Sequence, residues 1–225
     1  MLDDKQLSKD YLPGHKDIVL FQHRRMFRVN TDTSLLGNYI KVNKGDRVLD
    51  IGTNNGALLL YANLYQPSFL VGIDINKKAL EIAQVNFIQN KIENYSLVCE
   101  EISKYQGESL FDVIISNPPY FNTLNNELKN DNEDLKVARH EEYLSLDELF
   151  KGVKRNLNDE GIFYLIHPAF RFNEVQEKLN KYGLFIKKYC PVKDENKEND
   201  HVILYSITKN KKELCVQEER LIIRR

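Results

Sequence analysis

The chain has 225 residues, 42% of them hydrophobic, which is enough to bury the core of one domain of ordinary size. It has no long apolar run, and its first ten residues are acidic and polar, so we expect neither a membrane span nor a signal peptide. A formal net charge of −1 means that any contact with nucleic acid must come from local cationic patches. The three cysteines lack C-x-x-C spacing, which predicts a reduced, cytoplasmic protein with no metal site.

Residues 1–45 predict an N-terminal extension and a candidate lid before the first core strand. Pro13-Gly14 predicts a turn. The next segment mixes aromatic residues with three cations, and it fits either phosphate contact or a solvated strand or hairpin. Residues 34–40 predict a short amphipathic helix. The three cations are Arg24, Arg25 and Arg28.

A strand, a glycine loop and a helix then follow one another. The apolar residues 47–51 predict the strand, Gly52 to Gly56 the loop, and the helix begins near Ala57. Such a loop aims backbone N–H groups at a ligand, which the glycines allow to come close. A second strand over 68–73 ends at Asp74, which lies 22 residues beyond Gly52, a spacing suited to binding ribose hydroxyls.

The loop itself distinguishes between two cofactor classes. Nicotinamide enzymes typically carry G-x-G-x-x-G, whereas the loop beginning at Asp50 resembles the D-x-G-x-G-x-G loop of S-adenosylmethionine (SAM) dependent methyltransferases. Asn54 replaces the middle glycine. Asparagine tolerates left-handed backbone better than other residues with a side chain, so we expect the turn to survive. We also expect the Asn54 side chain to crowd the cofactor and weaken its binding.

Two further elements complete the first half of the chain. Asn76 is the expected cap of a helix over 77–90, with one apolar face. A strand over 96–99 delivers Glu100 and Glu101 at its carboxyl end. These two carboxylates fit either a contact with the cofactor or a solvated strand end.

An apolar strand over 111–115 leads into Ser116 and then Asn-Pro-Pro-Tyr. Two prolines remove two backbone donors, so the strand stops and holds Asn117 rigidly at its tip. The Asn117 side-chain oxygen and the Pro118 carbonyl can each accept one hydrogen of a planar NH2 group, and Tyr120 can stack on the ring that carries it. The motif resembles the signature of SAM-dependent methyltransferases that modify planar nitrogens. The alternative is a plain proline turn.

The second half predicts a mobile polar loop over 122–136 and then further helices and strands. Ser145 and Glu148 form a capping box for one helix, and Asn173 is the expected cap of another that ends at Gly183. Strands are expected over 162–167, 184–189 and 202–207, the last two as a closing antiparallel pair. The alternation predicts a doubly wound, Rossmann-like α/β sheet.

The domain organisation that follows is one domain over residues 1–225. Its parts are an extension over 1–45, a core over 46–208 and a basic tail over 209–225. The tail fits either an RNA contact or, more simply, a solvated terminus. Its cations are Lys209, Lys211, Lys212, Arg220, Arg224 and Arg225.

Taken together, these features resemble the bacterial tRNA(Val) adenine-N6 methyltransferase family. The resemblance implies a class I SAM-dependent methyltransferase whose partner is tRNA, at the adenosine beside the anticodon. Its motifs are Phe27, Thr31-Asp32, Leu35-Leu36-Gly37, the loop from Asp50 to Gly56, Asn117 to Phe121, and Ala138-Arg139-His140-Glu141. The resemblance assigns the ribose of SAM to Asp74, packing on its adenine to Ile75, and the adenine edge to Glu101-Ile102. In all, we expect SAM binding by Asp50, Gly52, Asn54, Gly56, Asp74, Ile75, Glu101, Ile102 and Asn117, catalysis by Asn117, Pro118 and Tyr120, and substrate contact by Pro119, Phe121, Arg24, Arg25, Arg28, Arg139 and His140.

Alternatives stay open beside this resemblance. Arg139 suits a salt bridge with Glu141 or Glu142 as well as it suits a phosphate. Methyltransferases for release-factor glutamine, rRNA guanine and DNA adenine share Asn-Pro-Pro-Tyr, but the chain has no room for a separate helical or target-recognition domain. Asn54 also leaves open a SAM- or RNA-binding scaffold with decayed activity. The sequence leaves the oligomeric state undecided.

Overall fold

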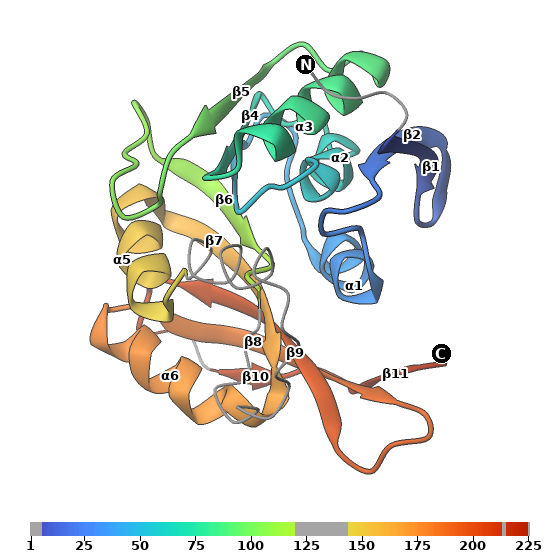
Figure 1. Ribbon diagram of the computed structural model, residues 1–225. Coiled ribbons are helices and arrows are strands. Elements are labelled where there is room, and N and C mark those ends of the chain that lie inside the picture. Colours follow the sequence, from blue (N-terminus) through green and yellow to red (C-terminus); the bar gives the residue numbers. More distant parts are fainter. Residues whose placement is uncertain (1–5, 120–143, 213–214, 225) are drawn as a thin grey trace, which may run out of the picture.

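The computed structural model describes residues 6–119, 144–212 and 215–224 of the chain. Its centre is a nine-stranded, mainly parallel sheet with helices on both faces (Figure 1). The strand order is β10-β8-β9-β7-β6-β3-β4-β5, and β11 also pairs with β8. The seven longer strands are β3 (Arg47–Ile51), β4 (Phe69–Asp74), β5 (Tyr95–Cys99), β6 (Phe111–Ser116), β7 (Leu157–Pro168), β8 (Phe185–Asp194) and β9 (Asp200–Thr208).

The sheet reverses its direction of growth beside β3. From β3 the chain adds β4 and β5 on one side, and it then returns to add β6 on the other side of β3. All these pairings are parallel, and Ile51 at the end of β3 lies in register with Ile73 of β4 and Ser116 of β6. In doubly wound sheets, ligands bind outside the carboxyl ends of the strands at such a reversal. The predicted doubly wound fold and its antiparallel β8–β9 closure are confirmed.

Two apolar cores lie on the two faces of the sheet. One contains the helices that precede or follow β3 and β4, and the other contains the helices of the second half. Neighbouring residues of one strand divide between them, since Val48 faces the first core and Leu49 the second. The helices of the first face are α1 (Thr31–Tyr39), α2 (Ala57–Asn63) and α3 (Lys77–Gln89), and those of the second are α5 (Leu146–Asn156) and α6 (Phe172–Lys181).

Most predicted elements are confirmed, and two helix starts need correction. Helix α1 begins at Thr31, three residues before the prediction, because the Asn30 side chain caps it by accepting the Thr33 N–H. The prediction that Asn173 caps α6 is wrong. A 3-10 turn, η2 (Ala169–Arg171), leads directly into α6, so Arg171 stands at the cap position and makes no side-chain cap. The capping box of Ser145 and Glu148 is confirmed.

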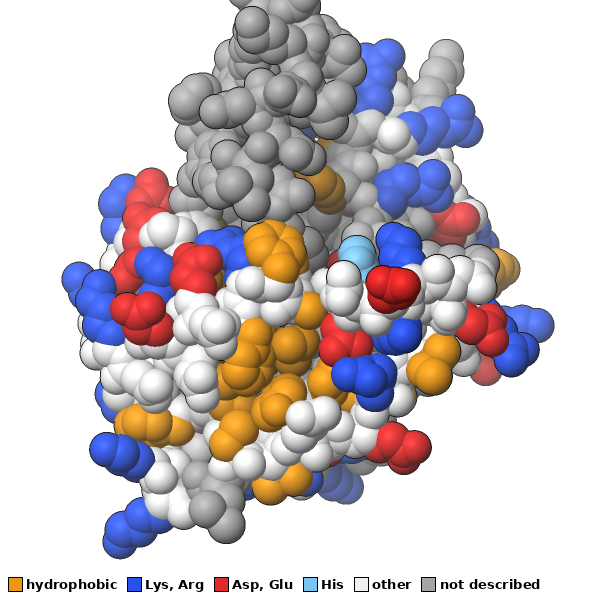
Figure 2. Space-filling view, turned by 90° about the horizontal axis from the view of Figure 1, so that it is seen from below, with side chains coloured by type: hydrophobic (Ala, Val, Ile, Leu, Met, Phe, Trp, Pro, Cys, Tyr) orange, Lys and Arg blue, Asp and Glu red, His pale blue; other side chains and the backbone are white. Residues whose placement is uncertain are grey.

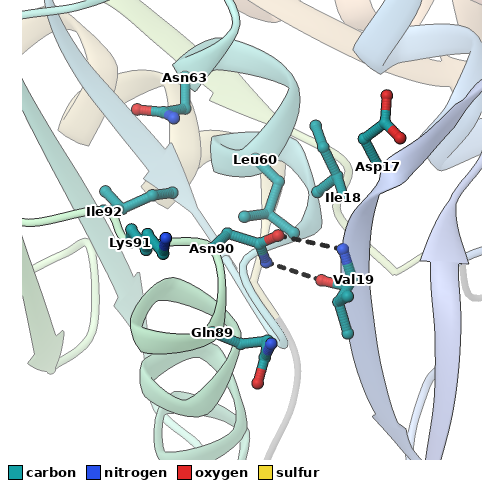
Figure 3. A pocket seen from close by; sticks show the side chains of 9 residues that line it. All are labelled: Asp17, Ile18, Val19, Leu60, Asn63, Gln89, Asn90, Lys91 and Ile92. Atoms are coloured by element: carbon teal, nitrogen blue, oxygen red, sulfur yellow. Dashed lines mark hydrogen bonds between the residues drawn. The ribbon is translucent and has the colours of Figure 1, made fainter.

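The N-terminal segment forms a two-stranded hairpin that docks on α3. Strands β1 (Leu7–Leu12) and β2 (His15–His23) pair antiparallel around Gly14, whose φ of +85° suits a glycine turn. The Asn90 carboxamide accepts the Val19 N–H at 3.0 Å and donates to the Val19 carbonyl at 2.7 Å (Figure 3). Asn86 makes the same pair of bonds with Phe21. The predicted turn at Pro13-Gly14 is therefore confirmed, while Arg24, Arg25 and Arg28 lie beyond the hairpin and the lid remains a prediction.

A cavity of about 310 Å³ lies beside this docking contact. Its lining comes from β2 and from the carboxyl ends of α2 and α3, including Asn63 and Lys91 (Figure 3). In a parallel α/β sheet, the helices end at the edge where the strands begin. The cavity is therefore at the opposite edge of the sheet from the strand ends that mark the predicted site.

The C-terminal tail belongs to the sheet. Strands β10 (Val216–Gln217) and β11 (Leu221–Ile223) both run parallel to β8 as short edge strands. The tail cations Lys211, Lys212, Arg220 and Arg224 are exposed, as the simpler expectation of a solvated terminus has it. Several of its cations pair within the chain, namely Arg220 with Asp200, Arg224 with Glu195 and Lys209 with Asp159. The described parts of the chain contain no helix long and apolar enough to cross a lipid bilayer.

Candidate active site

The predicted cofactor loop surrounds the carboxyl end of β3. Gly52 and Gly56 both adopt positive φ, at 75° and 79°. A Cβ at Gly52 would meet nothing within 4 Å, whereas a Cβ at Gly56 would lie 2.7 Å from the Phe87 ring. Gly56 is thus needed for packing of the loop against α3. Gly52 leaves open space at the point where a ligand would approach the backbone.

Asn54 tolerates the turn as the sequence predicted, with φ of 49°. Its backbone N–H donates to Asp74 Oδ2 at 2.8 Å. Its side-chain Nδ2 donates to the Phe27 carbonyl at 3.1 Å, a contact that a glycine cannot make. The residue therefore ties the loop both to the end of β4 and to the segment before α1. Weaker cofactor binding because of Asn54 stays a prediction.

Asp74 is placed to bind a ligand next to the loop. It ends β4 and accepts N–H bonds from Asn54 on Oδ2 and from Asn76 on Oδ1, both at 2.8 Å. Burial raises the pKa of this carboxyl, and the backbone N–H groups act in the opposite direction. Each carboxylate oxygen has a second lone pair, so Asp74 can still accept hydroxyl groups.

Asp50 lies entirely buried beneath the loop. Burial raises its pKa from 3.8 to about 7; the Thr53 hydroxyl acts in the opposite direction, and the charge of Asp74 adds to the rise. Asp50 is thus a buried carboxyl beneath the loop whose ionisation responds to conditions near neutral pH.

The residues assigned to the adenine divide into two groups. Ile75 is 44% exposed at the tip of β4, which suits packing on a planar ring. Glu101 is exposed and pairs with Lys104 at 3.0 Å. Ile102 is buried, and its side chain fills the space beside Gly152 of α5. The Ile102 side chain therefore belongs to the core, and only its backbone is left to reach an adenine edge.

The Asn-Pro-Pro segment follows β6 at the same edge of the sheet. The buried Ser116 hydroxyl donates to the Ile51 carbonyl at 2.9 Å, which ties the tips of β6 and β3 together. Asn117 is half-buried, Pro118 buried and Pro119 exposed. Asn117 Nδ2 donates to Thr33 Oγ1 of α1 at 3.2 Å. The rest of this motif, Tyr120 and Phe121, lies outside the described residues, as do the loop 122–136 and Arg139, His140 and Glu141.

The contact with Thr33 was missed by sequence reasoning. The family pattern includes Thr31-Asp32 but not Thr33. The signal that could have placed Thr33 was Asn30, because an asparagine before a helical segment is a common N-cap.

The expected RNA-contacting cations differ in their surroundings. Arg24 and Arg25 are exposed just beyond β2. Arg28 instead pairs with Asp10 at 2.9 Å, so its charge is partly neutralised. The view from below shows a patch of hydrophobic side chains with positive and negative side chains interspersed around it (Figure 2). This mixture agrees with the small net charge. Arg24 and Arg25 are two exposed cations that are adjacent in the chain.

The fold and the site together define a class of protein. The sheet reverses its growth beside a glycine loop with open backbone, an acidic residue follows at the next strand end, and an Asn-Pro-Pro tip stands across from the loop. Gly52, Asp74 and Ile75 fit the backbone approach, the ribose and the adenine of SAM. These are the features of a class I SAM-dependent methyltransferase.

Comparisons with known proteins agree with this class. A family model described as a methyltransferase domain matches residues 42–219. The tRNA1(Val) (adenine(37)-N6)-methyltransferase of Trichodesmium erythraeum (strain IMS101) is 32% identical over 221 residues, covering 92% of this chain and 87% of the relative. The protein of the same name from Bacteroides thetaiotaomicron is 30% identical over 209 residues, covering 92% and 86%.

Solved structures support the fold alone. Ribosomal protein L11 methylase from Lactobacillus delbrueckii subsp. bulgaricus superposes with a TM-score of 0.56 at 18% identity, over 79% of this chain and 76% of that one. Trm5b from Pyrococcus abyssi gives 0.64 at 15% identity, over 92% and 57%. The chain belongs to the methyltransferase-domain family and, within it, to the tRNA1(Val) (adenine(37)-N6)-methyltransferase family. It is an enzyme, and its cofactor is SAM.

Proposed function

We propose that the protein transfers the methyl group of SAM to the exocyclic N6 of adenosine 37 in tRNA1(Val). The observation that carries this proposal is the position of Asn117. It follows Ser116, whose hydroxyl bonds to the end of β3, so the Asn117 carboxamide stands at the edge where the cofactor loop begins. The names of the relatives supply the atom and the tRNA.

The chemistry asks for two hydrogen-bond acceptors. The exocyclic amine of adenine is a poor nucleophile because its lone pair is delocalised into the ring. Acceptors at Asn117 Oδ1 and the Pro118 carbonyl favour a pyramidal nitrogen, an interaction that is stronger in the transition state than in the ground state. When bound, SAM supplies a methyl group on a positively charged sulfur. Holding the nitrogen in line with that methyl contributes about 7 to 11 kcal/mol by removing entropic cost.

The proton leaves without a dedicated base. The C–N bond forms as the methyl–sulfur bond breaks, and the methylated nitrogen on the aromatic ring is then a strong acid. It loses its proton to water. The described residues therefore need only to position the amine and accept its hydrogens.

The substrate site extends from the strand tips to the N-terminal segment. An adenosine in an anticodon loop is turned out at lower cost than a paired base. The Asn54–Phe27 contact brings the segment after the hairpin next to the cofactor loop. Arg24 and Arg25 lie three and two residues before Phe27 in the chain, so they suit phosphates of the anticodon loop. A tRNA substrate supports a cytoplasmic location for the protein.

The decisive experiment is incubation of the purified protein with labelled SAM and total unmodified tRNA, followed by nucleoside mass spectrometry. We expect N6-methyladenosine, mapped to position 37. Methylation at another nitrogen or in another tRNA would overturn the substrate, and the absence of transfer to tRNA, with SAM bound, would point to a protein or rRNA substrate.

Salt dependence tests the proposed contact of Arg24 and Arg25 with phosphates. Each single-strand phosphate contact adds about −0.7 to the slope of log affinity against log salt. The double variant Arg24→Ala/Arg25→Ala should therefore show a clearly shallower slope for tRNA binding than wild type. Arg28→Ala is the matched control, because Asp10 already pairs with that arginine. An equal change in slope for both variants would contradict the assignment.

A further inference from the structure

Three side chains connect the first turn of α1 to the tip of β6. Asn30 Oδ1 accepts the Thr33 backbone N–H at 2.9 Å and lies 3.1 Å from the Thr33 hydroxyl. The same hydroxyl oxygen lies 3.2 Å from Asn117 Nδ2, although the two residues are 84 positions apart in the sequence. A continuous line of hydrogen bonds therefore runs from a helix cap to the residue assigned to the amine.

The direction of each bond in this line is fixed by its first member. A backbone N–H can only donate, so the atom of Asn30 that faces Thr33 is the oxygen of its carboxamide. That oxygen only accepts. The Thr33 hydroxyl has a single hydrogen, which it must then donate to Asn30 Oδ1. Toward Asn117 the hydroxyl is left with its lone pairs.

This polarity decides which end of the Asn117 carboxamide faces α1. A lone pair on Thr33 Oγ1 binds an NH2 group and repels a carbonyl oxygen. The nitrogen of Asn117 is accordingly held toward Thr33, and its oxygen is directed to the other side of the amide. A side-chain amide can otherwise turn by 180° about its last bond, which would exchange the acceptor for a donor.

We propose that Thr33 is a positioning residue that holds the Asn117 carboxamide in the orientation that presents an acceptor to the substrate amine. The inference rests on the proposed function, because only an amine substrate requires an oxygen there. The N-terminal segment then helps to orient Asn117, because the Asn30 cap fixes the direction in which the Thr33 hydroxyl donates.

The test compares Thr33→Val, which removes the hydroxyl and keeps the shape, with Thr33→Ser, which keeps the hydroxyl. Steady-state methylation should show kcat about tenfold lower for Thr33→Val, with KM for tRNA and Kd for SAM unchanged within twofold. Thr33→Ser should restore most of the turnover. Equal kcat for Thr33→Val and wild type would overturn the proposal, and so would equal losses for the two variants.

A double-mutant cycle separates positioning from support of the fold. In an Asn117→Ala background, Thr33→Val should cause no further loss of kcat, because the group that it orients is gone. A further tenfold loss there would mean that Thr33 acts through the fold.

Failure of this inference is distinguishable from failure of the proposed function. If wild type transfers no methyl group to tRNA, the proposed function fails. If wild type methylates tRNA and Thr33→Val does so equally well, only the role of Thr33 fails.

Discussion

Two parts of the proposed site are held in place by different kinds of contact. The cofactor corner is the loop from Gly52 to Gly56 with Asp74, and the tip is the segment from Ser116 to Pro119 at the end of β6. At the corner, Asn54 and Asp74 are joined over 20 residues of chain. At the tip of β6, the contacts reach across 65 residues from Ser116 to Ile51 and 84 from Asn117 to Thr33. The Asn54–Asp74 bond lies within one local βαβ unit. The tip depends on a helix that precedes the whole sheet, so the substrate side of the site is held by contacts between distant parts of the chain.

The first and second halves of the chain each contain a buried titratable group, and burial shifts the pKa values of the two groups in opposite directions. Asp50, under the cofactor loop, has its pKa raised by burial from 3.8 to about 7. His167, near the end of β7, has its pKa lowered by burial from 6.5 to about 3, with the charge of Arg171 acting in the same direction and Glu174 opposing it. The stability contributed by these two groups therefore responds to pH in opposite directions.

The largest expected effect is on the pH dependence of stability. Between pH 3.8 and 7, folded Asp50 keeps a proton that the unfolded chain releases, so rising pH destabilises the fold. Between pH 3 and 6.5, the unfolded chain protonates His167 and the folded chain does not, so falling pH destabilises it. Each contribution changes by about 1.4 kcal/mol per pH unit, and the two oppose each other where they overlap.

Single variants should expose the two contributions. Asp50→Asn leaves only the His167 contribution and should lose stability as the pH falls from 6.5 to 3, whereas His167→Gln leaves only the Asp50 contribution and should lose stability as the pH rises from 3.8 to 7. Urea unfolding of the cofactor-free protein, across that range, measures both. Parallel pH profiles for wild type and both variants would show that neither group titrates as described.

Asn117→Ala should lower turnover and leave SAM affinity unchanged. Loss of one acceptor aimed at the reacting amine should lower kcat by about 10²- to 10³-fold, by analogy with the removal of one oxyanion donor. Calorimetric affinity for SAM should stay within twofold of wild type. Asn94→Ala, an exposed asparagine before β5 at the opposite edge of the sheet, is the control and should change neither. Joint loss of turnover and SAM binding would mean that Asn117 is structural.

Gly52→Ala should weaken SAM binding, the property that Asn117→Ala leaves unchanged. Gly52 and Gly14 both have positive φ and open space around a Cβ, so either alanine strains the backbone by about 1 to 2 kcal/mol and lowers stability to a similar extent. Gly52 lies in the proposed cofactor loop and Gly14 in the hairpin turn, so only the Gly52 variant should bind SAM more weakly, by at least about tenfold by calorimetry. Equal SAM affinity for Gly52→Ala and Gly14→Ala would remove Gly52 from the cofactor site.

The sequence predicted the corner better than the tip, for physical reasons. Strand alternation and left-handed positions such as Asn54 are local, so a short window of sequence reveals them. Strands β10 and β11 have two and three residues, too few for a pattern, and were missed. The bond between Thr33 and Asn117 joins two side chains far apart in sequence, and neither residue signals the other. Which cations are neutralised, as Arg28 is by Asp10, also depends on tertiary contact.

The docking of the hairpin has a consequence for how the protein behaves in a crowded solution. An isolated hairpin has two free edges, and each can recruit a strand from another chain. On the outer edge of β2, the backbone groups of Val19 and Phe21 are already bonded to the side chains of Asn90 and Asn86. Two asparagines of a helix thus take the place of a third strand. They leave that part of the edge closed to aggregation.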